Sequence, residues 1–260
     1  MSNAPIKKSD RCKKWAQRSL KGSIAQVLDE RKKILIVTQD GKSSRYYFEA
    51  WRGRFAKGAV YLTVASANLS PLQLVSSLPA IRQQRELNIV KSKKVASFRF
   101  DEVWVAFDCD SFQDFDAAVY ALRRMSKDGF REAWSNECFE LWYLLHRASI
   151  SGAAPIPRTK LFNDCTMKFD VANRYHVPKY EKIKGAVGKD FHSEMANSKP
   201  EDIIQAISNA TSMNKETMSV RGGSSAQPSN LNPLTHVHEL IREFIKQSPE
   251  FVNQNPSFGF

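Results

Sequence analysis

The stretch from Phe100 to Asp110 most strongly constrains what this chain can fold into. An apolar run from Val103 to Phe107 leads directly into two carboxylates, Asp108 and Asp110, which are two positions apart. Because side chains alternate between the faces of a strand, both carboxylates are expected on the same side. In open α/β sheets, ligands bind outside the carboxyl ends of the strands. The pair therefore favours a site for Mg²⁺ or Mn²⁺, although acidic residues also follow buried strands simply where the chain reaches water.

Apolar runs and helical patterns alternate along the first half of the chain. Strands are expected at 34–37, 59–64, 102–107 and 132–135, and helices at 45–55, 71–87, 115–125 and 138–147. Ser43 or Ser44 is placed to cap the first of these helices, and Ser70 with Pro71 suits the start of the second. Strands that alternate with helices predict an α/β fold with a mostly parallel sheet covered by helices on both faces.

After about residue 150 the strand pattern weakens and helical patterns dominate. Helices are expected near 161–175, 200–213 and 234–247, and the Gly-, Ser-, Asn- and Pro-rich stretch 221–233 is expected to be a mobile loop. The predicted organisation is a basic arm at 1–30 with a short helix near 23–31, an α/β core at 31–150, a mainly helical region at 151–248 and a tail at 249–260.

The charge of the chain bears on its partners. The net charge is +12 over 260 residues, and basic residues crowd the N-terminus and recur at Lys91, Lys93 and Lys94. Such an excess favours nucleic acid over other partners, with binding that weakens steeply in salt. No apolar run approaches the length of a membrane span, and the Lys-rich start is no secretory signal. Four cysteines without a CxxC pair argue against a disulfide framework or a zinc site and fit a reducing cytoplasm.

Three segments carry a resemblance to a known family. They are 34–48 (ILIVTQDGKSSRYYF), 100–112 (FDEVWVAFDCDSF) and 135–146 (SNECFELWYLLH). In this order they resemble the RloB family, proteins with a TOPRIM-type fold that are encoded near restriction and anti-phage loci. The likeness extends to the stretch NPLTHVH at 232–238 and covers most of the chain. It implies a TOPRIM-like parallel sheet in which a Glu after the first strand and an Asp-x-Asp after the third hold a divalent metal.

The chain departs from that family pattern at the end of the first strand. Gln39 stands where the family carries Glu, and Ser44 stands where it carries an acidic residue. A Gln amide can offer a metal one neutral oxygen, but it supplies neither charge nor a base. Either Asp40 or Glu49 provides the missing carboxylate, or the site is weakened or inactive. Neighbouring departures favour natural divergence over a single engineered change.

The third segment holds three further polar candidates. Glu140 begins a helix of otherwise apolar residues, so its carboxylate must be paired, exposed or functional, and we place it beside the metal site. Asn136 is interpreted as a cap of the same helix, and His146 as a cation at the helix C-terminus. We expect neither Asn136 nor His146 to be catalytic.

Basic residues close to these segments are candidates for contacts with phosphate groups. They are Lys42 and Arg45 after the first strand, and Lys182 and Lys184 in a stretch that resembles a Tyr-x-Lys element of the family. Lys182 would stabilise charge on the phosphorus in the transition state. The tryptophans Trp51, Trp104, Trp134 and Trp142 are expected in the core, Tyr46 and Tyr47 stay open, and His236 and His238 are not expected to form a metal-binding pair.

Together the residues and the resemblance predict a Mg²⁺- or Mn²⁺-dependent phosphodiesterase. It would be the effector of an anti-phage abortive-infection system, with tRNA favoured over DNA as substrate and a genetically linked ATPase as partner. Asp108, Asp110 and Asp40 would hold the metal, Glu140 would support a second metal or the attacking water, and Gln39 marks the degenerate position.

Two other interpretations stay open at this point. One is a catalytically degenerate binding module or partner subunit with the same fold, and the other is a purely structural role without nucleic acid. The sequence contains no P-loop, so the chain itself is not expected to hydrolyse ATP. A homodimer and a cytoplasmic location complete the expectations.

Overall fold

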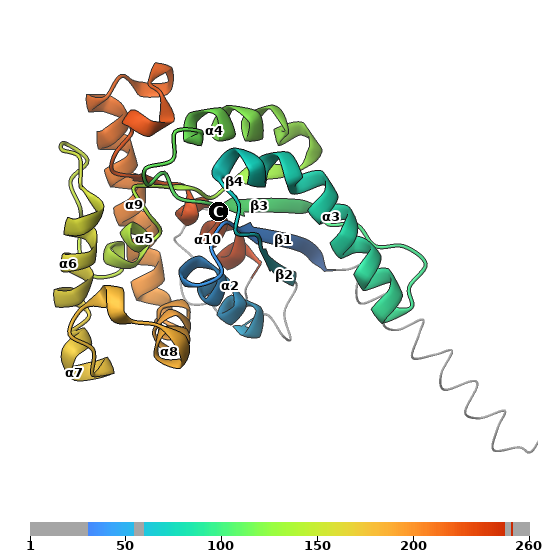
Figure 1. Ribbon diagram of the computed structural model, residues 1–260, viewed down its shortest axis with the longest axis horizontal. Helices are drawn as coiled ribbons and strands as arrows, with labels where there is room; N and C mark the ends of the chain where they lie inside the picture. The colour runs from blue at the N-terminus through green and yellow to red at the C-terminus, as the bar shows by residue number, and fades with distance from the viewer. Residues whose placement is uncertain (1–30, 55–59, 248–250, 252–260) are drawn as a thin grey trace, which may run out of the picture.

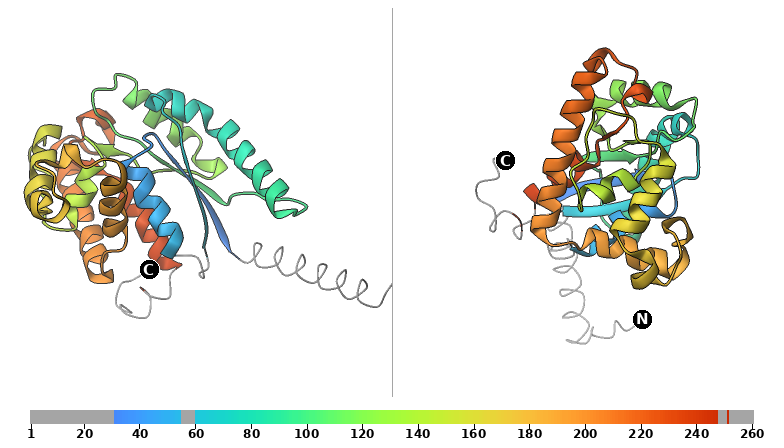
Figure 2. Two further views of the ribbon diagram at one scale, coloured as in Figure 1. Left: turned by 60° about the horizontal axis from the view of Figure 1, so that its bottom comes forward. Right: turned by 90° about the vertical axis from the view of Figure 1, so that its left-hand side faces the viewer.

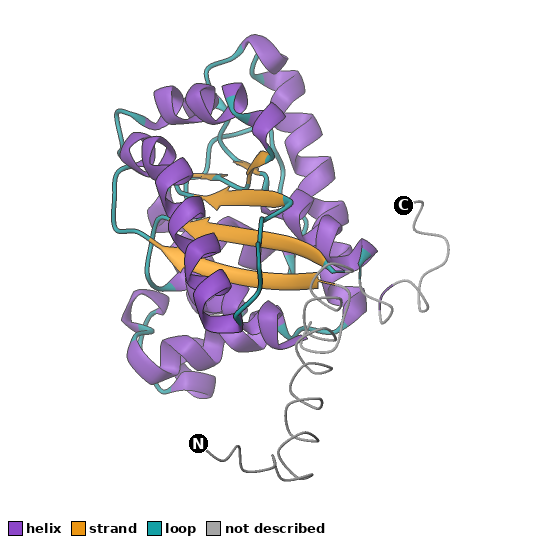
Figure 3. Ribbon diagram, turned by 90° about the vertical axis from the view of Figure 1, so that its right-hand side faces the viewer, coloured by secondary structure: helices purple, strands orange, loops and turns teal. Residues whose placement is uncertain are grey.

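A four-stranded parallel sheet forms the centre of the molecule (Figure 3). The structure is a computed structural model that describes residues 31–54, 60–247 and 251. The strands are β1 (Lys32–Thr38), β2 (Val60–Ser66), β3 (Glu102–Ala106) and β4 (Phe130–Glu132), in the spatial order β2-β1-β3-β4. Beyond β4 the chain continues into β5 (Ser135–Asn136), which pairs antiparallel with β6 (Leu234–Thr235).

Alternate residues of the strands build two separate hydrophobic layers. Ile34 and Ile36 of β1 pack with α2 (Ser43–Arg54) and α10 (Val237–Lys246). Leu35 and Val37 pack with α3 (Pro71–Lys93) and α4 (Phe115–Arg124) on the other face. Figures 1 and 2 show these helix pairs on opposite sides of the sheet. A strand covered on both faces requires consecutive apolar residues, which explains the run at 34–37.

A group of helices lies beyond the carboxyl ends of the strands (Figure 1). It contains α5 (Glu140–Leu145), α6 (Arg158–Lys168), α7 (Val171–Tyr175), α8 (Gly185–Ala196) and α9 (Pro200–Val220), with short 3₁₀ turns η2 (Tyr180–Lys182), η3 (Gly223–Ser225) and η4 (Pro228–Asn230). A further 3₁₀ turn, η1 (Ser126–Asp128), joins α4 to the amino end of β4. Trp142, Phe191 and Ile207 of this group share one buried cluster with β1 and α2. The helices are therefore joined to the sheet by a continuous core. Within the described residues, no helix combines the length and apolar character needed to cross a membrane.

The predicted fold class is confirmed, since the molecule is an α/β protein with a parallel sheet and a helical C-terminal region. Trp51, Trp104, Trp134 and Trp142 are all buried, as predicted. The predicted basic arm at 1–30 lies outside the described residues, and so does the predicted C-terminal tail apart from Phe251.

Several predicted element boundaries are wrong. The helix expected at 161–175 is split into α6 and α7 at Asp170, whose φ of 47° is left-handed and interrupts the helical path. The strand expected at 132–135 is divided, because β4 ends at Glu132 and the chain then turns to pair with β6. The first-half helix expected to end near Leu87 continues to Lys93, and α8 was not predicted.

The segment 221–233, expected to be a mobile loop, forms hydrogen bonds with other parts of the fold. The backbone N–H and the hydroxyl of Ser229 both donate to the Asp116 carboxylate at 2.7 Å. The side chain of Asn136 donates to the carbonyl oxygens of Pro228 and Ser229 at 3.1 and 2.9 Å. The composition of this segment disfavours a long helix or strand. It does not show that groups elsewhere in the fold form hydrogen bonds with the polar groups of the segment.

Candidate functional site

A cleft of about 450 Å³ opens at the carboxyl ends of β1, β2 and β3, where open α/β sheets bind their ligands. Its lining consists mainly of polar side chains from five segments of the chain: Gln39, Asp40, Ser43, Asn68, Leu69, Ser70, Asp108, Asp110, Phe112, Glu140 and Arg158. The predicted carboxylates Asp40, Asp108, Asp110 and Glu140 are thus brought together, and Gln39 lies among them.

The backbone that carries Asp108 and Asp110 is held by β5 rather than by β3. The strand ends at Ala106, and from there Cys109 N–H donates to the Ser135 carbonyl at 2.9 Å and Asp110 N–H to the Glu137 carbonyl at 3.0 Å. Asp110 has a left-handed φ of 41°, so simple strand alternation does not extend to it. Both side chains reach the cleft, as predicted, but this turn determines the orientation of Asp110.

The surroundings of Asp108 disfavour the charged form of its carboxyl group. Burial raises the pKa of Asp108 well above its usual value, and the nearby carboxylates of Glu140, Asp40 and Asp110 raise it further. None of the described groups donates a hydrogen bond to the Asp108 carboxylate. A carboxylate among carboxylates, without a donor of its own, is an environment that a bound cation would stabilise.

Glu140 is a paired carboxylate at the wall of the cleft. It is buried, and its Oε1 accepts hydrogen bonds from the Tyr180 hydroxyl at 2.9 Å and from the Ser43 hydroxyl at 3.3 Å. Burial nevertheless raises the pKa of Glu140 above the ordinary value. Tyr180 is the tyrosine of the Tyr-x-Lys stretch, so this element contributes to the site through its tyrosine. Lys182 and Lys184 are exposed and do not line the cleft.

The amide oxygen of Gln39 is already engaged. It accepts the backbone N–H of Asp108 at 3.1 Å. Because a backbone N–H can only donate, the oxygen of the amide must face it. Gln39 therefore helps to fix the position of Asp108, and its amide nitrogen is available as a hydrogen-bond donor.

Asp40 combines a place in the cleft with a local structural role. Its Oδ2 accepts the backbone N–H of Ser43 at 2.8 Å, and its Oδ1 accepts the hydroxyl of Ser44. Asp40 thereby caps α2, a position in which a carboxylate also faces the positive end of the helix. The prediction that Ser43 or Ser44 is the cap is wrong, because the helix already begins at Ser43.

Arg158 is the site residue that sequence reasoning missed. It begins α6, lies over the ring of Phe162 and forms an ion pair with the Asp110 carboxylate. The two partners are 48 positions apart, and no periodicity or motif links them. A guanidinium at the mouth of a carboxylate-lined cleft is well suited to hold a phosphate group.

Several other candidates are placed away from the cleft. Arg45 pairs with Glu49 at 2.9 Å on α2, so Glu49 does not supply the carboxylate that is missing at Gln39. Lys42 is exposed and is not part of the lining. Asn136 does not cap α5, since its side chain donates to the 221–233 segment.

His146 is buried rather than cationic. Its ring packs against Trp142, and neither ring nitrogen has a hydrogen-bond partner among the described residues. Burial lowers the pKa of His146 to about 3, so the ring is neutral at physiological pH. The interpretation of His146 as a charged group at a helix end is therefore wrong. Tyr47, left open by the sequence, is a core residue whose hydroxyl accepts the Trp142 indole N–H at 2.9 Å.

Across 31–54, 60–247 and 251, no group of three His, Cys, Asp or Glu side chains stands ready to hold a metal ion. In the cleft, Asp110 pairs with Arg158 and Asp40 caps α2. The donor set itself is all oxygen, with four carboxylates, and suits Mg²⁺ or Mn²⁺ in its chemistry. The ion pair engages one oxygen of Asp110, so a cation would share this carboxylate with Arg158 or displace it.

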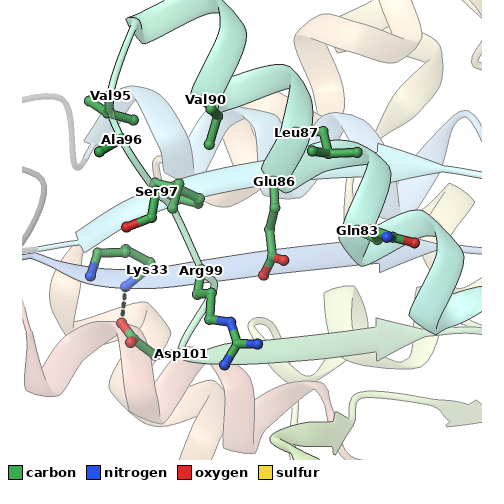
Figure 4. Close-up of a pocket in the computed structure, with 11 residues that line it drawn as sticks. Lys33, Gln83, Glu86, Leu87, Val90, Val95, Ala96, Ser97, Arg99 and Asp101 are labelled. Carbon is green, nitrogen blue, oxygen red and sulfur yellow. Dashed lines mark hydrogen bonds between the residues drawn. The ribbon is translucent and has the colours of Figure 1, made fainter.

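A larger hollow, of about 720 Å³, lies at the opposite end of the sheet (Figure 4). Its acidic residues are occupied by structural contacts: Asp101 accepts the backbone N–H of Lys33 at 2.7 Å, and Glu86 accepts that of Phe100 at 2.9 Å and pairs with Arg82. These bonds fix the approach to β3. The hollow lies at the amino ends of the strands, so it is not the candidate site.

Comparison with known families gives one match. The sequence model of the RloB-like protein family matches residues 34–244. Comparisons with curated proteins and with solved structures found no match. The matched range contains every residue that lines the cleft.

Proposed function

This chain belongs to the RloB-like family, and on that premise we propose that it is a divalent-metal-dependent nuclease. The proposal extends to its biological role, as the effector of an anti-phage abortive-infection system that works with a genetically linked ATPase. We rank tRNA before DNA as the substrate. The observation that carries the enzymatic part is the convergence of four carboxylates at the carboxyl edge of the sheet, with Asp108 buried among the other three.

Asp108 and Asp110 would hold Mg²⁺ or Mn²⁺, with Asp40 as a further ligand and Glu140 near a second ion or a water molecule. When bound, such a metal polarises a phosphodiester and lowers the pKa of a water ligand. Glu140 is oriented for its role by the hydroxyls of Tyr180 and Ser43. The buried setting raises the pKa of Glu140 above its ordinary value and so makes this carboxylate a better proton acceptor.

Arg158 and Gln39 would bind the substrate rather than the metal. Arg158 reaches the cleft from α6, where it pairs with Asp110. Its guanidinium would bind a phosphate group through two parallel hydrogen bonds. The amide nitrogen of Gln39 offers a neutral donor on the β1 side of the same cleft. The net charge of +12 supports a polyanionic substrate.

A second candidate function has its own supporting observation. No three potential ligands are arranged for a metal in the described residues, and the family's Glu is replaced by Gln39. The same fold could then act as a non-catalytic nucleic-acid-binding module or as a subunit of a defence complex. The two candidates differ in whether Asp108 is required for the biological effect.

The first experiment measures the thermal shift of the full-length chain in Mg²⁺ and Mn²⁺. We expect a rise in Tm with metal concentration, since a ligand that binds only the folded state stabilises it by mass action. Asp108→Asn should abolish this rise, whereas Asp190→Asn, a matched change at an exposed position on α8, should not. No shift in a folded wild-type protein would contradict a metal site and favour the binding module.

The second experiment tests the chemistry in cells. Induced expression with the linked ATPase should produce new tRNA ends, and these should vanish in Asp108→Asn while Asp190→Asn retains them. Breaks in DNA instead of RNA would identify DNA as the substrate and would still support the nuclease proposal. Intact nucleic acids together with undiminished phage protection in Asp108→Asn would sink the nuclease proposal.

A further inference from the structure

A second cavity, of about 460 Å³, lies on the outer side of α9, α10 and β6 and is separate from the carboxylate cleft. Its floor is apolar and includes the buried side chains Leu231 and Leu234, with Met218 and Ala226 beside them. Its rim carries Arg123, Lys215 and Arg242 (α9 and α10 are labelled in Figure 1). This size lies within the range of small-molecule sites in proteins.

The cations on this rim are only partly neutralised by the protein. Arg123 pairs with Glu132 at 2.9 Å, but neither Lys215 nor Arg242 forms an ion pair with a described residue. Arg242 instead donates to the hydroxyl of Thr211 at 3.1 Å, which fixes its guanidinium at the cavity. Glu239 lines the same wall and is hydrogen-bonded to the ring of His236 at 3.1 Å. Arg242 also helps to lower the pKa of the Glu239 carboxyl group, whereas Lys215 forms no ion pair with a described residue. Both cations face the cavity and can contact an anion bound there.

His238 adds a hydrogen-bonding group at the buried end. Its Nδ1 lies 2.9 Å from the carbonyl oxygen of Thr235, which can only accept, so Nδ1 carries the proton. Nε2 of the neutral ring is then an acceptor, and the residue lines the cavity. The cavity thus combines the cations Lys215 and Arg242 at its rim, an acceptor at depth and an apolar floor.

We propose that this cavity binds a phosphorylated small molecule of the nucleotide class. Lys215 and Arg242 would hold the phosphate, for which an Arg guanidinium offers paired donors. Leu231 and Leu234 would contact a planar base, and His238 would accept a hydrogen bond from it. A small ligand with only a carboxylate group would bind the cations but would not cover the apolar floor.

The cavity is also connected to the carboxylate cleft by a short path. Leu234 lies on β6, whose Thr235 hydroxyl is 2.8 Å from the hydroxyl of Ser135 on β5. Ser135 in turn bridges to Asp108. A ligand seated on Leu234 therefore contacts the strand pair that positions the proposed metal ligands, which makes the cavity a candidate regulatory site for the proposed function.

Calorimetric titration of the full-length protein with AMP tests the binding site, in EDTA so that the cleft holds no metal. We expect saturable binding that weakens at least tenfold in Lys215→Gln and in Arg242→Gln. Lys189→Gln, which removes the same charge from an exposed position on α8, should leave it unchanged. Lys215 is exposed, so its variant carries the test if Arg242→Gln fails to fold.

The proposal would be overturned by an absence of saturable AMP binding, by equal weakening in Lys189→Gln, or by inorganic phosphate that binds as tightly as AMP. Asp108→Asn keeps the failure modes apart, since it should retain AMP binding at this cavity even where it abolishes the metal response of the cleft. Loss of AMP binding in Asp108→Asn would assign the nucleotide to the cleft and also contradict the second site.

Discussion

Gln39 acts on the cleft through the backbone of its neighbouring strand. Its side-chain oxygen accepts the Asp108 N–H, so the residue positions a carboxylate instead of adding one. Burial raises the pKa of Asp108, and the nearby carboxylates of Glu140, Asp40 and Asp110 raise it further. At the scale of single residues, the cleft therefore has enough negative charge for a cation but lacks the ordered partner that a Glu at position 39 would provide.

Gln39→Glu should strengthen metal binding. The new carboxylate can accept the same N–H at 3.1 Å and adds a charge beside Asp108. We expect Mg²⁺ affinity to rise about tenfold, or about 1.4 kcal/mol, because the added charge attracts the cation directly. Without metal the added repulsion should lower Tm by roughly 2–4 °C, the shift typical of about 1 kcal/mol in a protein of this size. Both quantities follow from thermal shifts with and without Mg²⁺.

Gln39→Leu is the matched control for this change. It removes the acceptor and leaves the Asp108 N–H unpaired without adding charge, so it should destabilise the protein and leave Mg²⁺ affinity no higher than in the wild type. An unaltered Mg²⁺ response in a folded Gln39→Glu protein would argue that the cleft does not hold metal.

At the scale of elements, short irregular pieces carry much of the site. β5 and β6 each contain two residues, yet β5 holds the Asp108–Asp110 turn by backbone bonds. The 221–233 segment supports this pair, since Pro228 and Ser229 accept the side chain of Asn136 and Ser229 is anchored to Asp116. η2 contributes the Tyr180 hydroxyl that orients Glu140. None of these pieces has enough periodicity to be assigned from the sequence.

Asp116→Ala should release the 221–233 segment. The carboxylate accepts two hydrogen bonds of 2.7 Å from Ser229, and their loss leaves a partly buried N–H without a partner. We expect a loss of about 1–3 kcal/mol in the free energy of unfolding. Hydrogen exchange should accelerate at Ser229 and its neighbours before the rest of the protein opens.

Asp128→Ala on the turn η1 provides the control, because its exposed side chain makes no such anchor. Equal exchange rates in the Asp116→Ala and Asp128→Ala proteins would contradict the view that Asp116 fixes the segment.

At the scale of the whole molecule, one continuous core links the sheet to the helices beyond it. Trp142 of α5, Phe191 of α8 and Ile207 of α9 belong to the same buried cluster as Ile36 of β1. His146 packs against Trp142 of this cluster, and neither of its ring nitrogens has a hydrogen-bond partner among the described residues. Its pKa of about 3 means that the folded protein excludes a proton that the unfolded chain binds below about 6.5. Stability therefore has a pH-dependent component that belongs to the fold as a whole.

His146→Leu should remove that component. Above the unfolded pKa both states hold a neutral ring and the residue contributes nothing. As the pH falls below it, the unfolded state gains a proton and wild-type stability decreases by about 1.4 kcal/mol per pH unit. Between pH 7 and pH 5 the variant should therefore lose about 2 kcal/mol less than the wild type in urea unfolding. His176→Asn, a change at an exposed histidine, should follow the wild type.

The sequence by itself determined the class of fold and the edge of the sheet at which the site lies. Both follow from local order along the chain, since a buried strand must be apolar at consecutive positions and Asp108 comes directly after one. Glu140 at the start of α5 was predicted in the same way, because a carboxylate in an apolar helix stands out.

Only the tertiary structure decided which partners these groups have. Arg158 reaches Asp110 across 48 positions, and Tyr180 reaches Glu140 across 40. Folding likewise buries His146 without a partner and fastens 221–233 to Asp116. The residues in these contacts are far apart along the chain and follow no regular spacing. Their contacts arise from the packing of whole helices, so the local sequence does not indicate them.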